Sequence, residues 1–195
     1  MGYVSETHWE LLAATDFFTV EVWTARGLVT YYLLFTNHLA TRRVCIAGIT
    51  TNPNAAFMIQ VAWQLTDEFD GPLRSYRYLI MDRDDKFTPH FKALLRREGV
   101  EPVLCPPRAP NCNAYAERFV RSVKEECLDR FIPIGLASVR RAVCEYLVHY
   151  HGERNHQGLD NRLIEPPSCL DTRDRPVRRR ERLGGMLSYY YRLSI

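Results

Sequence analysis

The sequence has few cysteines and little net charge. The six cysteines form no CxxC pair and no Cys/His cluster at zinc spacing; they stand at positions 45, 105, 112, 127, 144 and 169. This distribution excludes a disulfide-stapled miniprotein and predicts reduced thiols in a cytosolic protein. The formal net charge of +3 on 195 residues indicates no particular class of partner.

The sequence also lacks a long apolar run, an internal repeat and a low-complexity tract. Its longest uncharged stretch, residues 44–66, is interrupted by turn-forming residues at 50–54. Residues 1–10 carry acidic side chains where a secretory signal would have a basic start and an apolar run. We therefore expect neither a membrane span nor export, and we predict a cytoplasmic protein.

The apolar residues are numerous enough for one globular core. They make up 46% of the chain, and aromatic residues make up 12%, which is typical of a domain that buries most of its apolar surface. We expect this domain over residues 1–165. From Pro166 onward the chain is rich in proline and then in arginine, so residues 166–195 are predicted to form a basic tail, in which residues 188–191 have the composition of an added edge strand.

Hydrophobic periodicity predicts the order βββαβαβ, followed by two long helices. The expected strands cover residues 11–22, 28–35, 43–49, 78–81 and 102–104. The expected helices cover residues 52–69, 91–97, 111–130 and 136–150. This order favours an α/β fold with a mixed five-stranded sheet, in which three antiparallel strands are followed by two parallel strands and helices flank the sheet.

Three carboxylates stand at unusual places in this pattern. Asp16 lies inside the first predicted strand, Asp82 directly follows a short apolar strand, and Glu117 lies near the start of a helix. Such carboxylates need either solvent or a compensating charge. If they converge at one edge of the sheet, they offer the hard oxygen ligands of a two-metal Mg²⁺ site for phosphoryl transfer. The alternative for each residue alone is a solvated surface acid or a helix cap.

The surroundings of these acids resemble a known family. The motifs are DRDDKF at residues 82–87, PNCNAYAERF at residues 110–119 and HYHGERNHQGL at residues 149–159, followed by Pro166-Pro167. In this order they resemble the integrase-core transposases of bacterial insertion sequences, which belong with the DDE transposases and retroviral-type integrases. The resemblance covers residues 9–167, most of the chain.

The resemblance implies a ribonuclease H-like fold in which Asp16, Asp82 and Glu117 are the catalytic, metal-binding triad. It implies two Mg²⁺ ions per site, with Mn²⁺ as a substitute, and DNA as the substrate. Water would free a 3′-hydroxyl at an element end, and that hydroxyl would then join a target strand in the bacterial cytosol. The sequence departs from the family pattern at Met81 and Asp85, so it is open whether Asp84 or Asp85 enters the metal shell.

Basic and amide side chains near the triad are candidate DNA contacts. Arg121 and Lys124 follow Glu117 by four and seven positions, on the same face of a helix. Their alternative is a solvated basic face. Asn111 and Asn113 in the preceding loop are further candidates, and a helix cap at Asn111 is the alternative for one of them. Lys86 is a candidate as well, with surface charge as its alternative.

Two clusters farther along the chain have weaker functional signals. The run Arg178-Arg179-Arg180 suits DNA backbone or another subunit, and its alternative is a soluble tail. His149, His151 and His156 lie around a helix end without a cysteine at finger spacing. Packing and hydrogen bonding are therefore expected of these histidines, with zinc binding as the less favoured alternative.

The implied reaction also predicts partners. Two DNA ends must be held together, so a homodimer or higher oligomer is expected. The segment before Asp16 is too short for a helix-turn-helix, so we expect a separate domain or protein to recognise the element ends. Two alternatives stay open: a nuclease of the same fold that does not join strands, and a DNA-binding remnant without catalytic activity.

Overall fold

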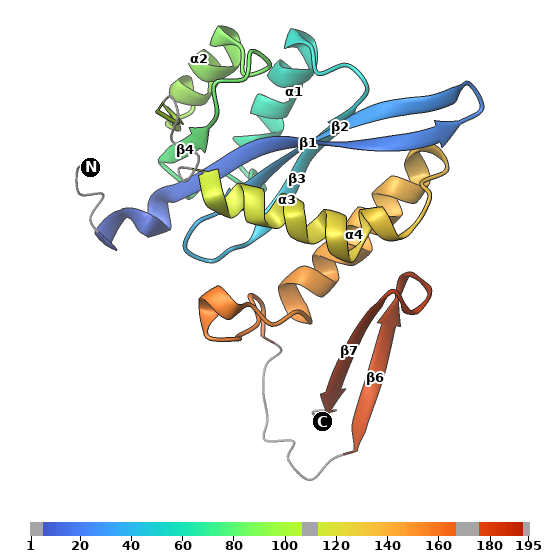
Figure 1. Ribbon diagram of the computed structural model, residues 1–195. Coiled ribbons are helices and arrows are strands. Elements are labelled where there is room, and N and C mark those ends of the chain that lie inside the picture. Colours follow the sequence, from blue (N-terminus) through green and yellow to red (C-terminus); the bar gives the residue numbers. More distant parts are fainter. Residues whose placement is uncertain (1–5, 107–112, 167–175, 193–195) are drawn as a thin grey trace. The chain divides into compact units, whose positions relative to one another are not determined.

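The computed structural model describes residues 6–106, 113–166 and 176–192 (Figure 1). Contacts within the chain divide it into two compact units. The first unit contains Met1–Glu21 and Leu28–Val120, and the second contains Val22–Gly27 and Arg121–Ile195. The domain boundary expected at residue 165 was inferred from composition and stays a prediction.

The first unit is built on a five-stranded sheet with the order β3-β2-β1-β4-β5. The strands are β1 (Leu12–Thr24), β2 (Gly27–His38), β3 (Val44–Thr50), β4 (Tyr78–Met81) and β5 (Glu101–Leu104). β2 and β3 pair antiparallel, whereas β4 runs parallel to both β1 and β5. The mixed sheet predicted from the sequence is confirmed.

The burial pattern of β1 explains its central place in the sheet. Ala13 and Ala14 are both buried, which shows that this end of the strand is covered on both faces. Farther along, Val20 and Val22 are buried while Glu21 between them is exposed. This alternation is typical of a strand with one solvated face.

Helices α1 (Ala55–Leu65) and α2 (Pro89–Arg97) pack on one face of the sheet. The side chain of Asn54 caps α1 by accepting a hydrogen bond from the backbone N–H of Phe57. Thr88 caps α2 in the same way, with Pro89 in the first turn. Both helices share one apolar core with the strands, which includes Ala13, Leu34, Ala47, Met58, Leu65, Leu79, Met81, Phe91 and Leu95.

Helix α3 (Ala114–Glu126) begins on the opposite face. Its Phe119 ring packs against Phe18 of β1 and Phe35 of β2, with ring centroids 6.4 and 4.9 Å away. Side chains alternate along a strand, so Phe18 points away from the face to which Ala13 contributes. Helices therefore cover both faces of the sheet.

The second unit is organised around α4 (Gly135–Gly152), which buries one apolar side. A separate antiparallel hairpin consists of β6 (Val177–Arg182) and β7 (Leu187–Arg192). Arg182 attaches this hairpin to the end of α4 through ion pairs with Glu153 and Glu145, both 2.8 Å long. The second unit also contains short 3-10 helices at Leu128–Arg130, Gln157–Leu159 and Leu183–Gly185. A further 3-10 helix in the first unit, Glu6–Leu11, directly precedes β1.

Three elements differ from the sequence prediction. The helix expected over residues 52–69 is α1 and ends at Leu65, because the Asp67 side chain accepts hydrogen bonds from the backbone of Phe69 and Asp70 and forms a turn instead. The helix expected over residues 111–130 is α3 and ends at Glu126, because the backbone of Cys127 leaves the helical region; residues 111–112 lie outside the described residues. The strand expected at residues 188–191 is part of β7, which pairs with β6 and not with the main sheet.

Within residues 6–106, 113–166 and 176–192, no helix is both long enough and apolar enough to cross a membrane.

Candidate active site

The pairing of β1 with β4 brings Asp16 and Asp82 together. The paired residues are Leu12 with Tyr78, Ala13 with Leu79, and Ala14 with Ile80. β4 ends at Met81, so Asp82 directly follows it, and the same register continued past the end of β4 would place Asp16 opposite Asp82. Because neighbouring strands lie about 4.8 Å apart, two residues at equivalent positions are spatial neighbours.

Both aspartates belong to the face of the sheet on which α3 begins. Met81 contributes to the core beneath α1 and α2, and the next residue, Asp82, therefore faces the other way. Phe18 shares its face of β1 with Asp16 and packs against Phe119 of α3. The two carboxylates and the start of α3 thus occupy one side of the sheet.

Glu117 lies in the first turn of α3, and its charge reaches Asp16. The pKa of Asp16 is raised from 3.8 to about 6, mainly by burial and in part by the negative charges of Asp82, Glu117 and Asp84. The hydrogen bond that the Phe17 N–H donates to Asp16 Oδ1 over 2.7 Å acts in the opposite direction. The charges of the other two predicted acids therefore act on Asp16.

The loop after β4 holds Asp82 and neutralises Asp84. The backbone N–H of Asp84 donates to Asp82 Oδ1 over 3.1 Å. Lys86 forms an ion pair with the Asp84 carboxylate, and its backbone N–H donates to Asp84 Oδ1 over 2.8 Å. Burial raises the pKa of Asp84, but the hydrogen bonds and the charge of Lys86 outweigh burial and lower it overall. Asp85 is exposed.

These residues fit Mg²⁺ in their chemistry. Carboxylate oxygens are the ligands that Mg²⁺ prefers, together with water and substrate phosphate, and the mutual repulsion of these carboxylates would be relieved by a cation. Among the described residues, no group of three or more His, Cys, Asp and Glu side chains lies close enough together to hold a metal ion. Glu117 is exposed on α3, so it is the member that would have to approach the two aspartates.

The basic residues predicted near the triad differ in their surroundings. Arg121 is exposed on α3, and Lys124 is half-buried. Lys86 is engaged by Asp84, and its ammonium group lies 5.5 Å from the centroid of the Phe17 ring. A DNA contact by Lys86 would have to replace its pairing with Asp84.

Asn113 is buried, although the sequence predicts that it contacts DNA. Its side chain is 7% exposed, and its Nδ2 donates to the carbonyl oxygen of Thr15 over 3.3 Å. Thr15 directly precedes Asp16, so this hydrogen bond connects the start of α3 with the site. Contact with DNA would require that the amide leave Thr15.

Asn37 was not predicted from the sequence, although its side chain, like that of Asn113, connects the start of α3 with the sheet. The sequence predicts a strand that ends at residue 35, whereas β2 continues to His38 and buries Thr36 and Asn37. Asn37 Nδ2 donates to the carbonyl oxygen of Tyr115, in the first turn of α3, over 3.2 Å. In the sequence, the one sign of burial at Asn37 is that polar residues directly continue an apolar strand. This pattern does not identify Tyr115, 78 residues away, as the partner.

The arginine run in β6 is partly engaged within the second unit. Arg180 pairs with Glu153 over 3.3 Å, and Arg179 pairs with Glu181 over 2.9 Å. Arg178 is exposed. Of the three predicted DNA contacts in this run, Arg178 therefore has the most accessible charge.

The histidines at the end of α4 take part in packing and hydrogen bonding. His149 Nδ1 lies 3.1 Å from Glu153 Oε2, and His156 Nε2 lies 2.7 Å from the carbonyl oxygen of Tyr150. The structural role predicted from the sequence is confirmed at these two positions.

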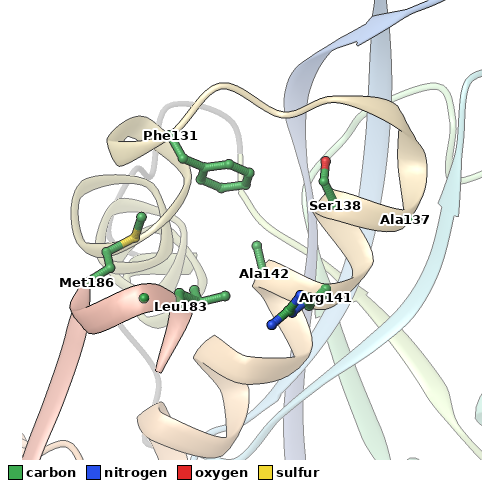
Figure 2. Close-up of a pocket in the computed structure, with 8 residues that line it drawn as sticks. Phe131, Ala137, Ser138, Arg141, Ala142, Leu183 and Met186 are labelled. Carbon is green, nitrogen blue, oxygen red and sulfur yellow. The ribbon is translucent and has the colours of Figure 1, made fainter. Parts of the chain in front are cut away.

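The second unit also contains an apolar pocket of about 500 Å³. Figure 2 shows the Phe131 ring and the Leu183 and Met186 side chains around it, where the turn between β6 and β7 meets the start of α4. Its lining is Phe131, Ala137, Ser138, Arg141, Ala142, Leu183, Gly184 and Met186. No carboxylate is present in this lining, so the pocket is not the candidate active site.

Comparison with known proteins finds similarity to the integrase core domain and to an insertion element protein. Residues 98–163 match the model of the integrase core domain family. The chain is 34% identical over 76 residues to the "Insertion element IS476 uncharacterized 39.2 kDa protein" of Xanthomonas euvesicatoria. This match covers 38% of the chain and only 22% of the relative's length. The predicted resemblance to the integrase-core family is confirmed.

Solved structures of the HTLV-2 integrase catalytic core domain have a similar fold. Its trimeric form in complex with magnesium gives a TM-score of 0.56 at 11% identity, over 80% of this chain and 93% of that chain. Its dimeric form in complex with magnesium gives a TM-score of 0.53 at 12% identity, over 73% of this chain and 86% of that chain. The ribonuclease H-like fold expected from the sequence is thereby confirmed.

Proposed function

We propose that this chain, whose residues 98–163 match the model of the integrase core domain family, is the catalytic core of a DDE transposase from a bacterial insertion element. The proposed reaction is metal-dependent cleavage that frees a 3′-hydroxyl at an element end, followed by transfer of that end to target DNA. The observation that carries the proposal is the parallel pairing of β1 and β4, which brings Asp16 near Asp82 directly after β4, on the face where α3 supplies Glu117.

Asp16, Asp82 and Glu117 are the residues that would hold the metal ions. Asp16 lies on β1 and Asp82 directly follows the neighbouring strand β4, in a sheet covered on both faces, which restricts the distance between their backbones. Bound Mg²⁺ would activate the attacking oxygen and stabilise the leaving oxygen of a phosphodiester. The magnesium complex of the HTLV-2 integrase core supports this choice of metal, and Mn²⁺ would substitute for it.

The loop after β4 would position Asp82 and not add a further ligand. The Asp84 N–H keeps one oxygen of Asp82 in place, and Lys86 engages the carboxylate of Asp84. We therefore assign Asp84 a supporting role. Asp85 is exposed next to this loop and is a matched position for testing that assignment.

Exposed arginines are the best candidates for contacts with DNA phosphates. Arg121 follows Glu117 on the same helix and is exposed, and Arg178 is exposed on β6. Lys124, Arg179 and Arg180 would contribute as secondary contacts. Because two DNA ends must be held together, we expect an oligomer, with end recognition supplied by another domain or protein in the bacterial cytosol.

The test is a strand-transfer assay with products resolved by size. A supercoiled plasmid is incubated with a pool of labelled duplexes of randomised end sequence and Mg²⁺ or Mn²⁺. The wild type, Asp82→Asn and the control Asp70→Asn are compared, because Asp70 is an exposed acid outside the triad. We expect labelled duplex joined to plasmid with the wild type and Asp70→Asn, and no joined product with Asp82→Asn.

The other outcomes point to the alternative functions. Nicking that depends on Asp82, without joined product, would replace the proposal with a ribonuclease H-like nuclease. DNA binding that weakens with salt, without nicking or joining, would indicate a non-catalytic remnant.

A further inference from the structure

We propose that two buried amides, Asn113 and Asn37, are positioning residues that fix Glu117 relative to Asp16. This inference rests on the proposed function, because it concerns the same carboxylates. It assigns to Asn113 a role other than a direct DNA contact, and it adds Asn37, a residue distant in sequence.

The first amide connects the start of α3 to the strand that carries Asp16. Asn113 directly precedes α3, and its Nδ2 donates over 3.3 Å to the backbone carbonyl of Thr15, the residue before Asp16. The hydroxyl of Thr15 in turn donates to the Phe35 carbonyl over 2.7 Å. Asn113 is therefore attached to a segment that is itself bound to the neighbouring strand.

The second amide approaches the same helical turn from β2. Asn37 Nδ2 donates over 3.2 Å to the carbonyl of Tyr115, two residues before Glu117. The Tyr115 ring is also restrained, since the guanidinium of Arg42 lies 3.5 Å from its centroid and Trp9 meets it edge-on at 5.9 Å. Asn113, directly before α3, and Tyr115, in the first turn of α3, are thus each hydrogen-bonded to one of two adjacent strands.

Burial of these two amides lowers the stability of the fold, because part of each amide is removed from water without a hydrogen-bond partner among the described residues. Asn37 is 1% exposed and Asn113 is 7% exposed. In the described part of the chain, Oδ1 of each finds no hydrogen-bond partner. A buried amide with an unpaired oxygen is less favourable than an apolar side chain of similar size. Stability alone therefore does not account for two asparagines here, whereas directional placement of the helix does.

Apolar packing alone would not define this placement. Phe119 contacts Phe18 and Phe35 through ring faces and edges, and such contacts are non-directional, so they tolerate small shifts of α3 along the sheet. Hydrogen bonds depend on distance and angle and do not tolerate such shifts. Mg²⁺ accepts little deviation from octahedral geometry. Partners that orient ligands consequently affect metal affinity by about 10-fold or more when they are removed.

The test measures Mg²⁺ affinity without DNA and without catalysis. Amide resonances of isotope-labelled protein are followed during Mg²⁺ titration for the wild type, Asn37→Ala and Asn113→Ala. Asn37→Ser is included as a milder variant in case the alanine variant does not fold. Thr36→Val is the matched control, because Thr36 is a buried neighbour whose hydroxyl has no partner among the described residues.

We expect each asparagine variant that gives a folded spectrum to bind Mg²⁺ about 10-fold more weakly than the wild type. Thr36→Val should bind Mg²⁺ with the affinity of the wild type. If folded asparagine variants bind Mg²⁺ within twofold of the wild type, the amides only stabilise the fold and the inference is wrong, while the proposed function stands. Absence of Mg²⁺ binding by both the wild type and Thr36→Val would overturn the metal site itself.

Discussion

Asp16 of β1 lies near Asp82, the residue that directly follows the adjacent parallel strand β4, and the charge of Asp82 raises the pKa of Asp16. They are distant in sequence, and the parallel pairing alone makes them neighbours. Placing acids side by side costs stability in the absence of a cation, because burial and like charge both oppose ionisation of Asp16. A site that binds a divalent cation would recover this cost on binding.

Removal of the Asp16 charge should therefore make the metal-free protein more stable. We expect Asp16→Asn to raise the free energy of unfolding of the metal-free protein at pH 7 by about 1 kcal/mol, a shift of about 2–4 °C in Tm. The amide oxygen can still accept the hydrogen bond from Phe17. Calorimetry without metal checks this, with Asp85→Asn as the exposed control; a lower Tm for Asp16→Asn would contradict the electrostatic account.

The proposed DNA contact at Arg121 makes a prediction about salt. Arg121→Gln should weaken binding to duplexes of different sequence by a similar factor, and it should reduce the slope of log K against log salt by about 1. Fluorescence anisotropy over a salt series measures both quantities. Arg140→Gln is the control, because Arg140 is exposed on α4 and is not a proposed contact; equal slopes for both variants would remove Arg121 from the interface.

The attachment of the β6–β7 hairpin depends on one buried acid. Glu153 is 7% exposed and pairs with Arg182, Arg180 and His149. Glu153→Gln removes this carboxylate from Arg180 and leaves Arg182 with Glu145 alone, and we expect it to cost about 3 kcal/mol of unfolding free energy. Glu181→Gln breaks only the exposed pair with Arg179 and should cost less than about 1 kcal/mol. Similar costs for the two variants in urea unfolding would contradict the assignment.

The same acid predicts how stability depends on pH. Burial would raise the pKa of Glu153, but the hydrogen bonds from Arg182 and His149 outweigh burial and lower it from 4.5 to about 2. An acid with a lowered folded-state pKa stabilises the fold above its ordinary pKa, and this contribution disappears as pH falls toward the folded-state value. The stability difference between the wild type and Glu153→Gln should therefore be full at pH 6 and shrink between pH 4.5 and about 2. A difference that stays constant over this range would contradict the lowered pKa.

Local patterns in the sequence predicted the sheet and most helices, because hydrophobic periodicity and caps such as Thr88 act within a few residues. They were insufficient where a local alternative competes, as at Asp67, whose side chain forms a turn where the helix was expected to continue. The triad residues could be named because each acid interrupts an apolar pattern or lies in a recognisable motif. Asn37 could not be named, since its significance comes from a tertiary hydrogen bond to Tyr115.

The central claim is that Asp16, Asp82 and Glu117 form one metal site, and Mn²⁺ binding tests it most directly. Free Mn²⁺ is quantified by electron paramagnetic resonance in titrations of the wild type, Asp82→Asn, Glu117→Gln and the exposed control Asp70→Asn. The account predicts binding by the wild type and Asp70→Asn, and affinity at least about 10-fold weaker for the two triad variants. Equal Mn²⁺ affinity in all four proteins would contradict it.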